Sequence, residues 1–461
     1  MSNKRDLLNA PKNGYARIDD KTRSAIFSFN EDYKVFIDAA KTEREAVLWT
    51  ISEAEKRGFR PFVRGEALKA GDKIYRSNRS KSLILAVIGS EAPGKGFRIT
   101  ASHIDSPRLD LKMNPLFEDN ELAYFKTHYY GGIKKFHWVN IPLELRGVVA
   151  LKDGSVTNVV YGADPVDPAL VITDILIHLS AEQMKKTMAD GITGEGLNAL
   201  VGSIPAAGED GDNRVKLAVM CILNDKYGIT EADLVSAELS LVPSFNSRDV
   251  GFDRSVVGAY GHDDRVCAFD DSRALFDLNK IPARTAVCVL ADKEEIGSMG
   301  VSGMQSAFFD TFCEDICDAY GVPLRVCYES SFCLSNDVAA AYDPNWPQPF
   351  EKRNTALLNY GIGITKYTGR GGKSGGSDAS AELIAHLRKL FDDAGVVWQV
   401  ALLGAVDAGG GGTVAQFMAN RNIDTVDCGV PVLSMHSPWE LVSKFDNYMT
   451  YAGVKAFYSE K

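Results

Sequence analysis

The spacing of hydrophobic and polar residues changes along the chain and divides it into three parts. Near the start, apolar residues recur at helical spacing over residues 30–58, and short apolar runs at 82–89 and 97–102 are typical of buried strands. Over residues 110–245, apolar and polar residues alternate between glycines, which is typical of antiparallel strands. From residue 250 onward, apolar runs alternate with stretches of helical spacing.

This alternation predicts the α/β class, with a mostly parallel sheet covered by helices on both faces. The middle part is expected to be a β-rich domain that is inserted into the main domain. We expect the main domain to comprise residues 1–109 and 246–461, and the insert to comprise residues 110–245. Further helices are expected at 213–227, 267–279, 305–320, 378–395 and 438–458.

Composition and charge restrict the class of protein. The 461 residues are 45% hydrophobic and carry a net charge of -10 without a basic run, which argues against nucleic-acid binding. No apolar stretch approaches the roughly 18 residues that span a membrane. The N-terminus lacks the apolar core of a signal peptide. The eight scattered cysteines fit reduced thiols, so we expect a cytoplasmic protein.

One pair of adjacent acids is unusual for its position. Glu294 and Glu295 follow an apolar run at 285–290 and precede Gly297. A polar turn after a strand would explain them, but one carboxylate could also hold a metal while its neighbour handles a proton. Because adjacent strand residues point to opposite faces, both can serve one site only where the chain has left strand geometry. We therefore expect a turn here.

Other acids and histidines recur where apolar runs end or a helix begins. These residues are His103 with Asp105, Asp263 with Asp264, Asn336 with Asp337, and His436. Each has an ordinary explanation when taken alone, such as a helix N-cap for Asp264. In an open α/β sheet, however, ligands collect beyond the carboxyl ends of the strands. We therefore expect these side chains to meet in one crevice.

So many carboxylates in one crevice would repel each other, and a cation would resolve the conflict. Imidazole together with carboxylate favours zinc, with cobalt or manganese as alternatives, over calcium or magnesium. Two histidines and three or more carboxylates exceed what one open catalytic zinc requires. Two divalent metal ions that share a bridging carboxylate fit the count better, and such a pair can activate water for hydrolysis.

The order and spacing of these motifs resemble the aspartyl aminopeptidase family of dinuclear zinc exopeptidases. The likeness covers nearly the whole chain and is carried by His103-x-Asp105, Asp264, Glu294-Glu295-Ile296-Gly297-Ser298, Asp337 and Met435-His436-Ser437. The resemblance implies that Asp264 bridges two metals. It also implies that His103 and Asp337 complete one metal site, and that Glu295 and His436 complete the other.

The same resemblance implies further roles. Glu294 would be the general base, and Asp105 would orient His103. His178, in the insert, would correspond to a histidine that reaches the active site of a neighbouring subunit. Because the family assembles as dodecamers with the insert at subunit contacts, the resemblance implies a homo-oligomer built from dimers. The main domain would then be the catalytic domain, and the insert an oligomerisation domain.

The sequence departs from the family near its substrate pocket. Aspartyl-specific members have His-Pro-Asn where this chain has Asp343-Pro344-Asn345. We expect Asp343 and Lys366 to contact the substrate. A carboxylate at position 343 would repel an acidic side chain unless a nearby cation offsets it. The preference for N-terminal Asp or Glu is therefore expected to be altered.

The expected function is a metal-dependent aminopeptidase that removes the N-terminal residue of peptides, through a water activated by two metals and with Glu294 as general base. Two alternatives remain open from the sequence. One is a related two-metal amidohydrolase with another class of substrate. The other is a non-catalytic scaffold of the same fold, although a protein released from catalysis has no physical reason to keep both the ligand set and Glu294.

Overall fold

The computed structural model describes residues 7–9, 11–164 and 166–460. Contacts between Cα positions divide the chain into two compact units. The first unit comprises residues 1–105, 247–435 and 439–461, and the second comprises residues 106–246 and 436–438. The chain has a mixed α/β fold with several sheets.

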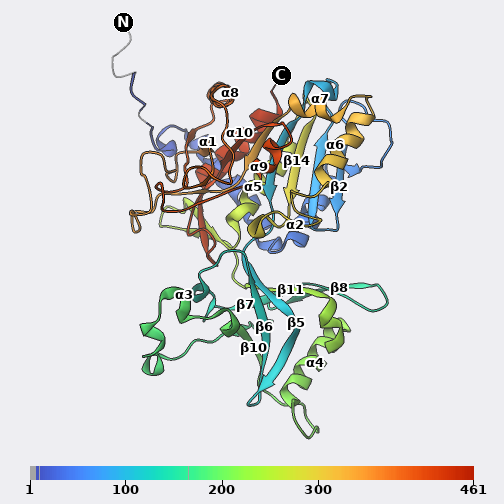
Figure 1. Ribbon diagram of the computed structural model, residues 1–461, viewed down its shortest axis with the longest axis vertical. Coiled ribbons are helices and arrows are strands. Elements are labelled where there is room, and N and C mark those ends of the chain that lie inside the picture. Colours follow the sequence, from blue (N-terminus) through green and yellow to red (C-terminus); the bar gives the residue numbers. More distant parts are fainter. Residues whose placement is uncertain (1–6, 10, 165, 461) are drawn as a thin grey trace. The chain divides into compact units, whose positions relative to one another are not determined.

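A large mixed sheet forms the centre of the first unit (Figure 1). Its nine strands, counted over the described residues, are in spatial order β1 (Arg60–Pro61), β2 (Lys73–Asn78), β3 (Ser82–Val87), β14 (Ala286–Ala291), β4 (Arg98–His103), β15 (Phe332–Asn336), β21 (Asp424–Gly429), β17 (Ile362–Thr365) and β19 (Trp398–Val400). The four neighbours β14, β4, β15 and β21 pair in parallel. Their antiparallel neighbours are β3 on one side and β17 on the other.

Helices pack on both faces of this sheet. Alternate residues of β14 enter two separate hydrophobic clusters, Val287 and Val289 in one and Cys288 and Leu290 in the other. The helices that contribute to the Val287 cluster are α6 (Phe308–Asp318), α7 (Leu324–Glu329) and α9 (Ala415–Ala419). Those that contribute to the Cys288 cluster are α1 (Asp20–Ala39), α2 (Glu43–Glu55), α5 (His262–Phe276), α8 (Ala381–Asp393) and α10 (Lys444–Tyr458).

The prediction of a single helix over residues 30–58 is wrong, because the chain forms two helices there. α1 begins earlier than expected, with the Asp19 side chain capping the N–H of Thr22. The chain breaks after Ala39, and α2 begins with a capping box between Thr42 and Glu45. The apolar spacing continues across the break because both helices face the same core. The capping motif, rather than the periodicity, marks the boundary.

The expected helix at 438–458 also begins too early. Residues Glu440–Ser443 form a short strand, β23, and the Ser443 hydroxyl caps α10 by accepting the N–H groups of Phe445 and Asp446. β23 belongs to a smaller sheet of the first unit, whose described strands are in order β12 (Arg248–Val250), β13 (Val256–Ala259), β23, β22 (Pro431–Leu433) and β16 (Ala339–Ala340). The glycine-rich segments β18 (Gly369–Arg370) and β20 (Gly410–Gly411) pair separately.

The second unit is built on a seven-stranded sheet, counted over the described residues (Figure 1). Its order is β8 (Val156–Tyr161), β7 (Leu143–Ala150), β11 (Ala237–Pro243), β5 (Arg108–Asp119), β6 (Leu122–Tyr130), β10 (Asn198–Gly202) and β9 (Val171–Ile172). All of its pairs are antiparallel, as the alternating pattern predicts. The expected helix at 213–227 is confirmed as α4 (Arg214–Tyr227), and α3 (Met188–Gly191) is a single turn.

No helix in the described part of the chain is long and apolar enough to cross a membrane.

Candidate metal centre

Three parallel strands bring polar residues to one edge of the large sheet. β4 lies between β14 and β15, and its last residue, His103, stands opposite Ala291 at the end of β14. Asp337 follows directly after β15. Because parallel strands end at the same edge, the residues that follow them are close in space although they are far apart in sequence.

The turn expected at Glu294 and Glu295 is confirmed. β14 ends at Ala291, and residues 294–296 form a 3₁₀ turn. The turn is bounded by two residues in the left-handed region, Lys293 at φ 68° and Gly297 at φ 95°. Glycine adopts this conformation without a steric penalty. The backbone has thus left strand geometry where both glutamates occur, so their side chains are not forced to opposite faces.

Asp105 is fully buried and joins His103 to this turn. Its Oδ1 lies 3.3 Å from Nδ1 of His103 and accepts the backbone N–H of Glu294 at 3.1 Å. Its Oδ2 accepts the N–H of Glu295 at 3.2 Å. The backbone carbonyl of Asp105 also lies 3.0 Å from Nδ1 of His103, so this residue orients the imidazole ring through both groups, while its carboxylate holds the backbone of both glutamates.

Asp263 and Asp264 are buried at the start of α5 in a segment without helical backbone angles. Asp263 has φ -80° and ψ 107°, Asp264 has φ -116° and ψ 24°, and the peptide bond between them is cis. Oδ2 of Asp264 accepts the N–H of His103 at 3.2 Å, and Oδ1 of Asp263 lies 3.2 Å from Nε2 of His103. The expected helix at 267–279 thus begins a few residues earlier, with this irregular segment at its N-terminus.

Two overlapping groups of possible ligand atoms occur in the first unit. In the first group, atoms of His103, Asp264 and Asp337 all lie within 4.8 Å of one another. The second group combines His103 with Asp263 and Glu295 at the same spacing. Glu294 is adjacent, with Oε2 at 3.9 Å from Nε2 of His103.

Burial makes these acids difficult to ionise without a partner. It raises the pKa of Asp264 well above its ordinary value, and the neighbouring carboxylate of Asp337 raises it further. Burial likewise raises the pKa of Asp337. For His103, burial alone would lower the pKa, but hydrogen bonds to Asp105 and Asp263 outweigh it and raise the pKa well above the usual range. The site thus holds an excess of carboxylates and is largely shielded from water.

The donor set fits a zinc ion. Oδ1 of Asp264 is buried and has no hydrogen-bond partner among the described residues, although a buried carboxylate oxygen normally has one. A cation would occupy such a position and neutralise the acids around it. Imidazole with carboxylate is also the set of ligands that catalytic zinc prefers.

The other expected residues have contacts elsewhere. His436 belongs to the second unit, where its Nδ1 lies 2.8 Å from the carbonyl oxygen of Gly132. His178 is exposed on a short 3₁₀ turn of that unit. Lys366 donates to Asp378 and to the carbonyl of Ala379, both at 2.7 Å.

Asp343 follows β16 in the first unit. Its carboxylate accepts the N–H of Asn345 at 2.9 Å, which stabilises the local turn. It is absent from both donor groups found among the described residues.

The sequence placed Asp263 in the cluster with Asp264 but assigned it no ligand role. Its position beside Asp264 was a signal, but a regular helix would turn adjacent side chains about 100° apart. Only the irregular backbone of this segment allows both carboxylates to approach His103.

These features of the structure alone indicate a class of enzyme. Buried acids and a histidine gather at the carboxyl edge of a parallel sheet, beside a glutamate that can carry a proton, and this arrangement is that of a metal-dependent hydrolase. Residues 36–458 match the family model described as aminopeptidase I zinc metalloprotease (M18). The chain belongs to this family, so it is a zinc aminopeptidase, and the resemblance seen in the sequence is confirmed.

Three relatives illustrate the match. A probable M18 family aminopeptidase 1 of Clostridium acetobutylicum is 49% identical over 460 residues, covering 98% of this chain and 99% of that one. The crystal structure of an M18 aminopeptidase from Thermotoga maritima has a TM-score of 0.94 at 40% identity, covering 98% of this chain and 100% of that one. A structure of the S. cerevisiae mApe1 dodecamer has a TM-score of 0.74 at 20% identity, covering 93% and 95%, and shows the fold alone.

Family membership decides between the alternatives that the sequence left open. It favours an aminopeptidase over an amidohydrolase of another substrate class, and an enzyme over a non-catalytic scaffold.

Proposed function

We propose that this aminopeptidase uses two zinc ions. Asp264 would be shared by both ions, His103 and Asp337 would complete one site, and Glu295 and His436 would complete the other. The observation that supports two ions is a pair of donor groups that meet at His103, one with Asp264 and Asp337 and the other with Asp263 and Glu295. The shared role of Asp264 follows the family resemblance. Asp263 is a further candidate ligand, since it lies within the second group.

The tautomer of His436 is consistent with a ligand role. A carbonyl oxygen only accepts, so the contact with Gly132 assigns the ring proton to Nδ1. Nε2 then carries the lone pair that a metal requires. A backbone carbonyl is a common partner for the second nitrogen of a metal-binding histidine, because it fixes the orientation of the ring.

When bound, the two zinc ions would polarise the scissile carbonyl and lower the pKa of a water molecule. Glu294 would take the proton from the attacking water and return it to the departing amine. Asp105 supports this role, because its Oδ1 holds the backbone N–H of Glu294 at 3.1 Å. Asp105 also keeps His103 in one orientation, so it acts on position rather than on the proton.

For the substrate, we propose a peptide whose first side chain lies near Lys366 and Asp343. Lys366 already pairs with Asp378 at 2.7 Å, and Lys373 pairs with the same carboxylate at 2.7 Å. Because Asp378 offsets part of this positive charge, the pocket offers less attraction to an acidic side chain than an unpaired lysine would. We infer that the first residue need not be acidic.

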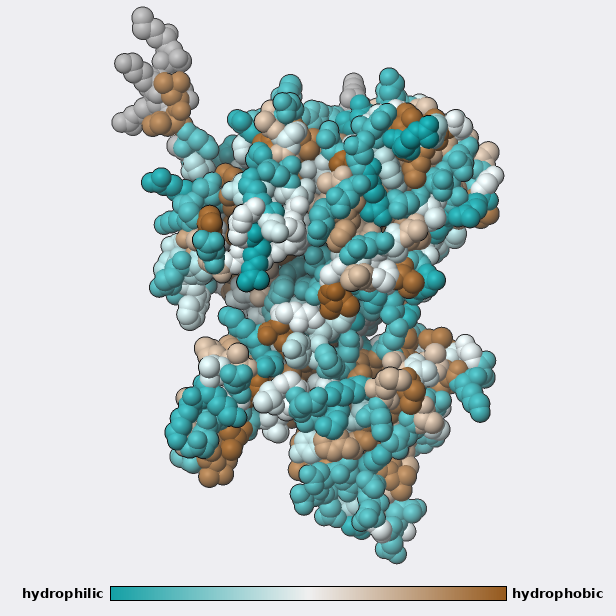
Figure 2. All heavy atoms as spheres, in the orientation of Figure 1, coloured by the Kyte–Doolittle hydropathy of each residue, from teal (hydrophilic) through white to brown (hydrophobic). Residues whose placement is uncertain are grey.

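We also propose a homo-oligomer, with the second unit as the oligomerisation domain. The segment around His178 exposes Ile175, Leu176, Ile177 and Leu179. Figure 2 shows hydrophobic residues at the surface of this unit. Exposed apolar residues gathered in one segment are typical of an interface. A dodecamer like that of the yeast relative would cover them, and His178 would reach a neighbouring subunit.

A cytoplasmic location is also part of the proposal. All eight cysteines are free thiols, and seven of them are buried. Unpaired cysteines in this number are typical of a reducing compartment. The finer architecture we propose, a zinc-exopeptidase-like catalytic domain with its parallel strands at the centre, accords with the parallel neighbours of β4.

Replacing Glu294 by Gln tests the mechanism. The amide keeps the size of the side chain but cannot accept the proton, so kcat should fall roughly 10²- to 10⁴-fold. Zinc content, measured by elemental analysis after dialysis, should stay close to that of the wild type. Glu329→Gln, at an exposed position in α7, is the matched control and should retain full activity.

Near-normal turnover in Glu294→Gln would refute the general-base role. Loss of zinc together with activity would instead make Glu294 a ligand and overturn the proposed division between the two glutamates.

A further inference from the structure

The Asp263–Asp264 segment must be held by something other than its own helix. Neither residue has helical backbone angles, so the regular hydrogen bonds of α5 do not fix them. Gly261, just before the segment, has φ 78°. A Cβ atom at Gly261 would lie 1.5 Å from a guanidinium nitrogen of Arg265, so the chain packs tightly around this turn. The carboxylates that face His103 therefore depend on their surroundings for position.

Two buried side chains anchor this segment: Glu440, whose Oε2 accepts the backbone N–H of Asp263 at 3.0 Å, and His262. The ring of His262 is fully buried, with Nε2 at 3.1 Å from the carbonyl oxygen of Val257 and Nδ1 at 2.6 Å from the hydroxyl of Tyr33. The carbonyl can only accept, so Nε2 carries the proton and Nδ1 accepts from Tyr33. The ring is thus clamped between β13 and α1, and neither element carries a proposed metal ligand.

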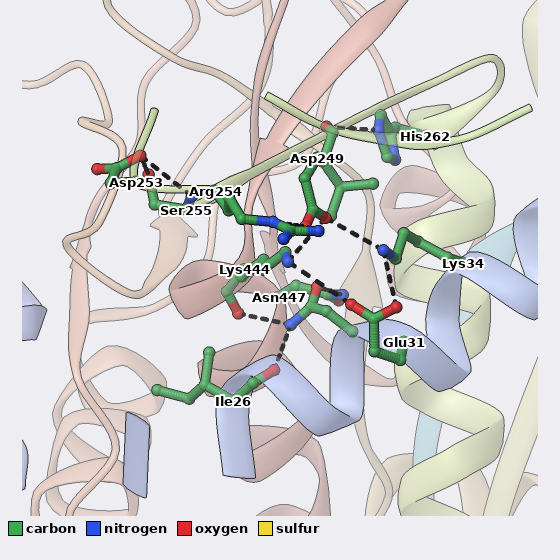
Figure 3. A network of polar contacts seen from close by, with 12 residues as sticks. Ile26, Glu31, Lys34, Asp249, Asp253, Arg254, Ser255, His262, Lys444 and Asn447 are labelled. Atoms are coloured by element: carbon green, nitrogen blue, oxygen red, sulfur yellow. Dashed lines mark hydrogen bonds and ion pairs between the residues drawn. The ribbon is translucent and has the colours of Figure 1, made fainter. Parts of the chain in front are cut away.

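Tyr33 is itself held firmly, because α1 is tied to its neighbours by a partly buried polar network (Figure 3). Lys34 lies 3.1 Å from the carboxylate of Asp249 in β12, and Lys444 at the start of α10 lies 2.8 Å from the same oxygen. Asn30 donates to the carbonyl of Lys444 at 3.0 Å. Lys444 and Asn30 are fully buried, so the contact between them is shielded from water and helps to fix the position of α1.

We propose that Tyr33 is a positioning residue for the metal centre. Its hydroxyl holds the ring of His262, and this ring helps to fix the backbone from which Asp263 and Asp264 reach His103. The inference rests on the proposed role of Asp264 as a metal ligand. It assigns a function to a side chain on α1 that touches neither the substrate nor the proposed ligands.

Tyr33→Phe is the direct test, because it removes one oxygen atom and keeps the buried ring. Zinc affinity of the full-length apoprotein, measured by competition with a chromogenic chelator, should fall about tenfold, the lower end of the roughly 10- to 100-fold loss seen when a supporting partner is removed. The absorption spectrum of the cobalt-substituted protein should change, because it reports ligand geometry. We expect kcat to fall while KM changes little.

Two further variants separate positioning from stability. Tyr451→Phe is the matched control, since its hydroxyl donates to Asp277 at 2.8 Å in the same hydrophobic cluster. It should lower the melting temperature without changing zinc affinity or the cobalt spectrum. His262→Gln can accept from Tyr33 and donate to Val257, so it should retain more zinc affinity than His262→Leu.

The outcomes are distinguishable. If Tyr33→Phe matches Tyr451→Phe in zinc affinity and cobalt spectrum, Tyr33 is only structural and the inference is overturned. Asp264→Asn tests the premise separately. Wild-type zinc affinity in that variant would refute the proposed ligand role, whereas loss of zinc in Asp264→Asn with none in Tyr33→Phe would refute the positioning role alone.

Discussion

Replacing Asp105 by Asn should weaken zinc binding and catalysis together. The carboxylate serves three donors, the His103 ring and the N–H groups of Glu294 and Glu295. Asn keeps only one oxygen. If that oxygen stays at the Oδ1 position, the amide NH2 group takes the Oδ2 position. Two hydrogen-bond donors, this NH2 group and the N–H of Glu295, then face each other, and that hydrogen bond is lost. The variant therefore loses about one hydrogen bond to a charged group, and it also loses the charge that favours the oriented His103 ring.

A hydrogen bond to a charged group contributes about 1.5 to 3 kcal/mol. At about 1.4 kcal/mol for each factor of ten, zinc affinity and kcat/KM should fall roughly 10- to 100-fold. Zinc affinity is measured by chelator competition, and kcat/KM with an aminoacyl-anilide at saturating zinc. Both losses arise from one cause, so they should be of similar size.

Asp446→Asn is the matched control for this experiment. Asp446 is also fully buried and accepts two backbone N–H groups, from Asn359 at 2.7 Å and Gly361 at 2.6 Å. It should destabilise the fold without changing zinc affinity. If Asp105→Asn binds zinc and turns over substrate as Asp446→Asn does, the reasoning that joins Asp105 to His103 and the glutamate turn is wrong.

Two further predictions concern specificity and pH. In a panel of aminoacyl-anilides, we expect hydrolysis of neutral or basic first residues as well as acidic ones, with Lys366→Met changing the relative rates; strong selectivity for Asp and Glu would contradict the proposed pocket. Burial alone would raise the pKa of Asp249, but Lys444, Arg254 and Lys34 outweigh it and lower the pKa to about 2. Because the folded pKa lies below the unfolded one, the stabilisation is present above about pH 4 and is lost as pH falls toward about 2. The urea midpoints of the wild type and Asp249→Asn should therefore converge on acidification, and a constant difference would refute this.

The sequence was informative where each feature depends on neighbouring residues. The apolar run before Ala291 marks β14, and the glycine at 297 together with two adjacent acids marks the turn that follows. The same holds for β4 and β15, which end at His103 and Asn336. A strand end followed by polar residues can be read from sequence, because burial requires an apolar run and its end is local.

The boundaries of helices were harder to predict from the spacing of apolar residues. The break between α1 and α2 leaves the apolar spacing unchanged, since both helices pack on the same core. The sequence did contain the signal, a threonine at 42 and a glutamate at 45, which form the capping box. A reading that gave caps priority over spacing would have divided the helix correctly.

The residues that hold the candidate ligands in place do so through contacts between distant parts of the sequence, which no local sequence pattern reveals. Tyr33 reaches His262 from 229 residues away in sequence, and Asp105 reaches the N–H of Glu294 from 189 residues away. Nothing in the spacing around Tyr33 separates it from the other aromatic residues of α1, because its helical face is buried for packing as well. The donors can be proposed from their chemistry, since few arrangements other than a cation explain so many buried acids. The groups that hold the donors are ordinary residues, and only the fold distinguishes them. If Tyr33→Phe and Asp105→Asn both weaken zinc binding while their matched controls do not, the affinity of this centre depends on α1 and on the end of β4 as much as on the ligands themselves.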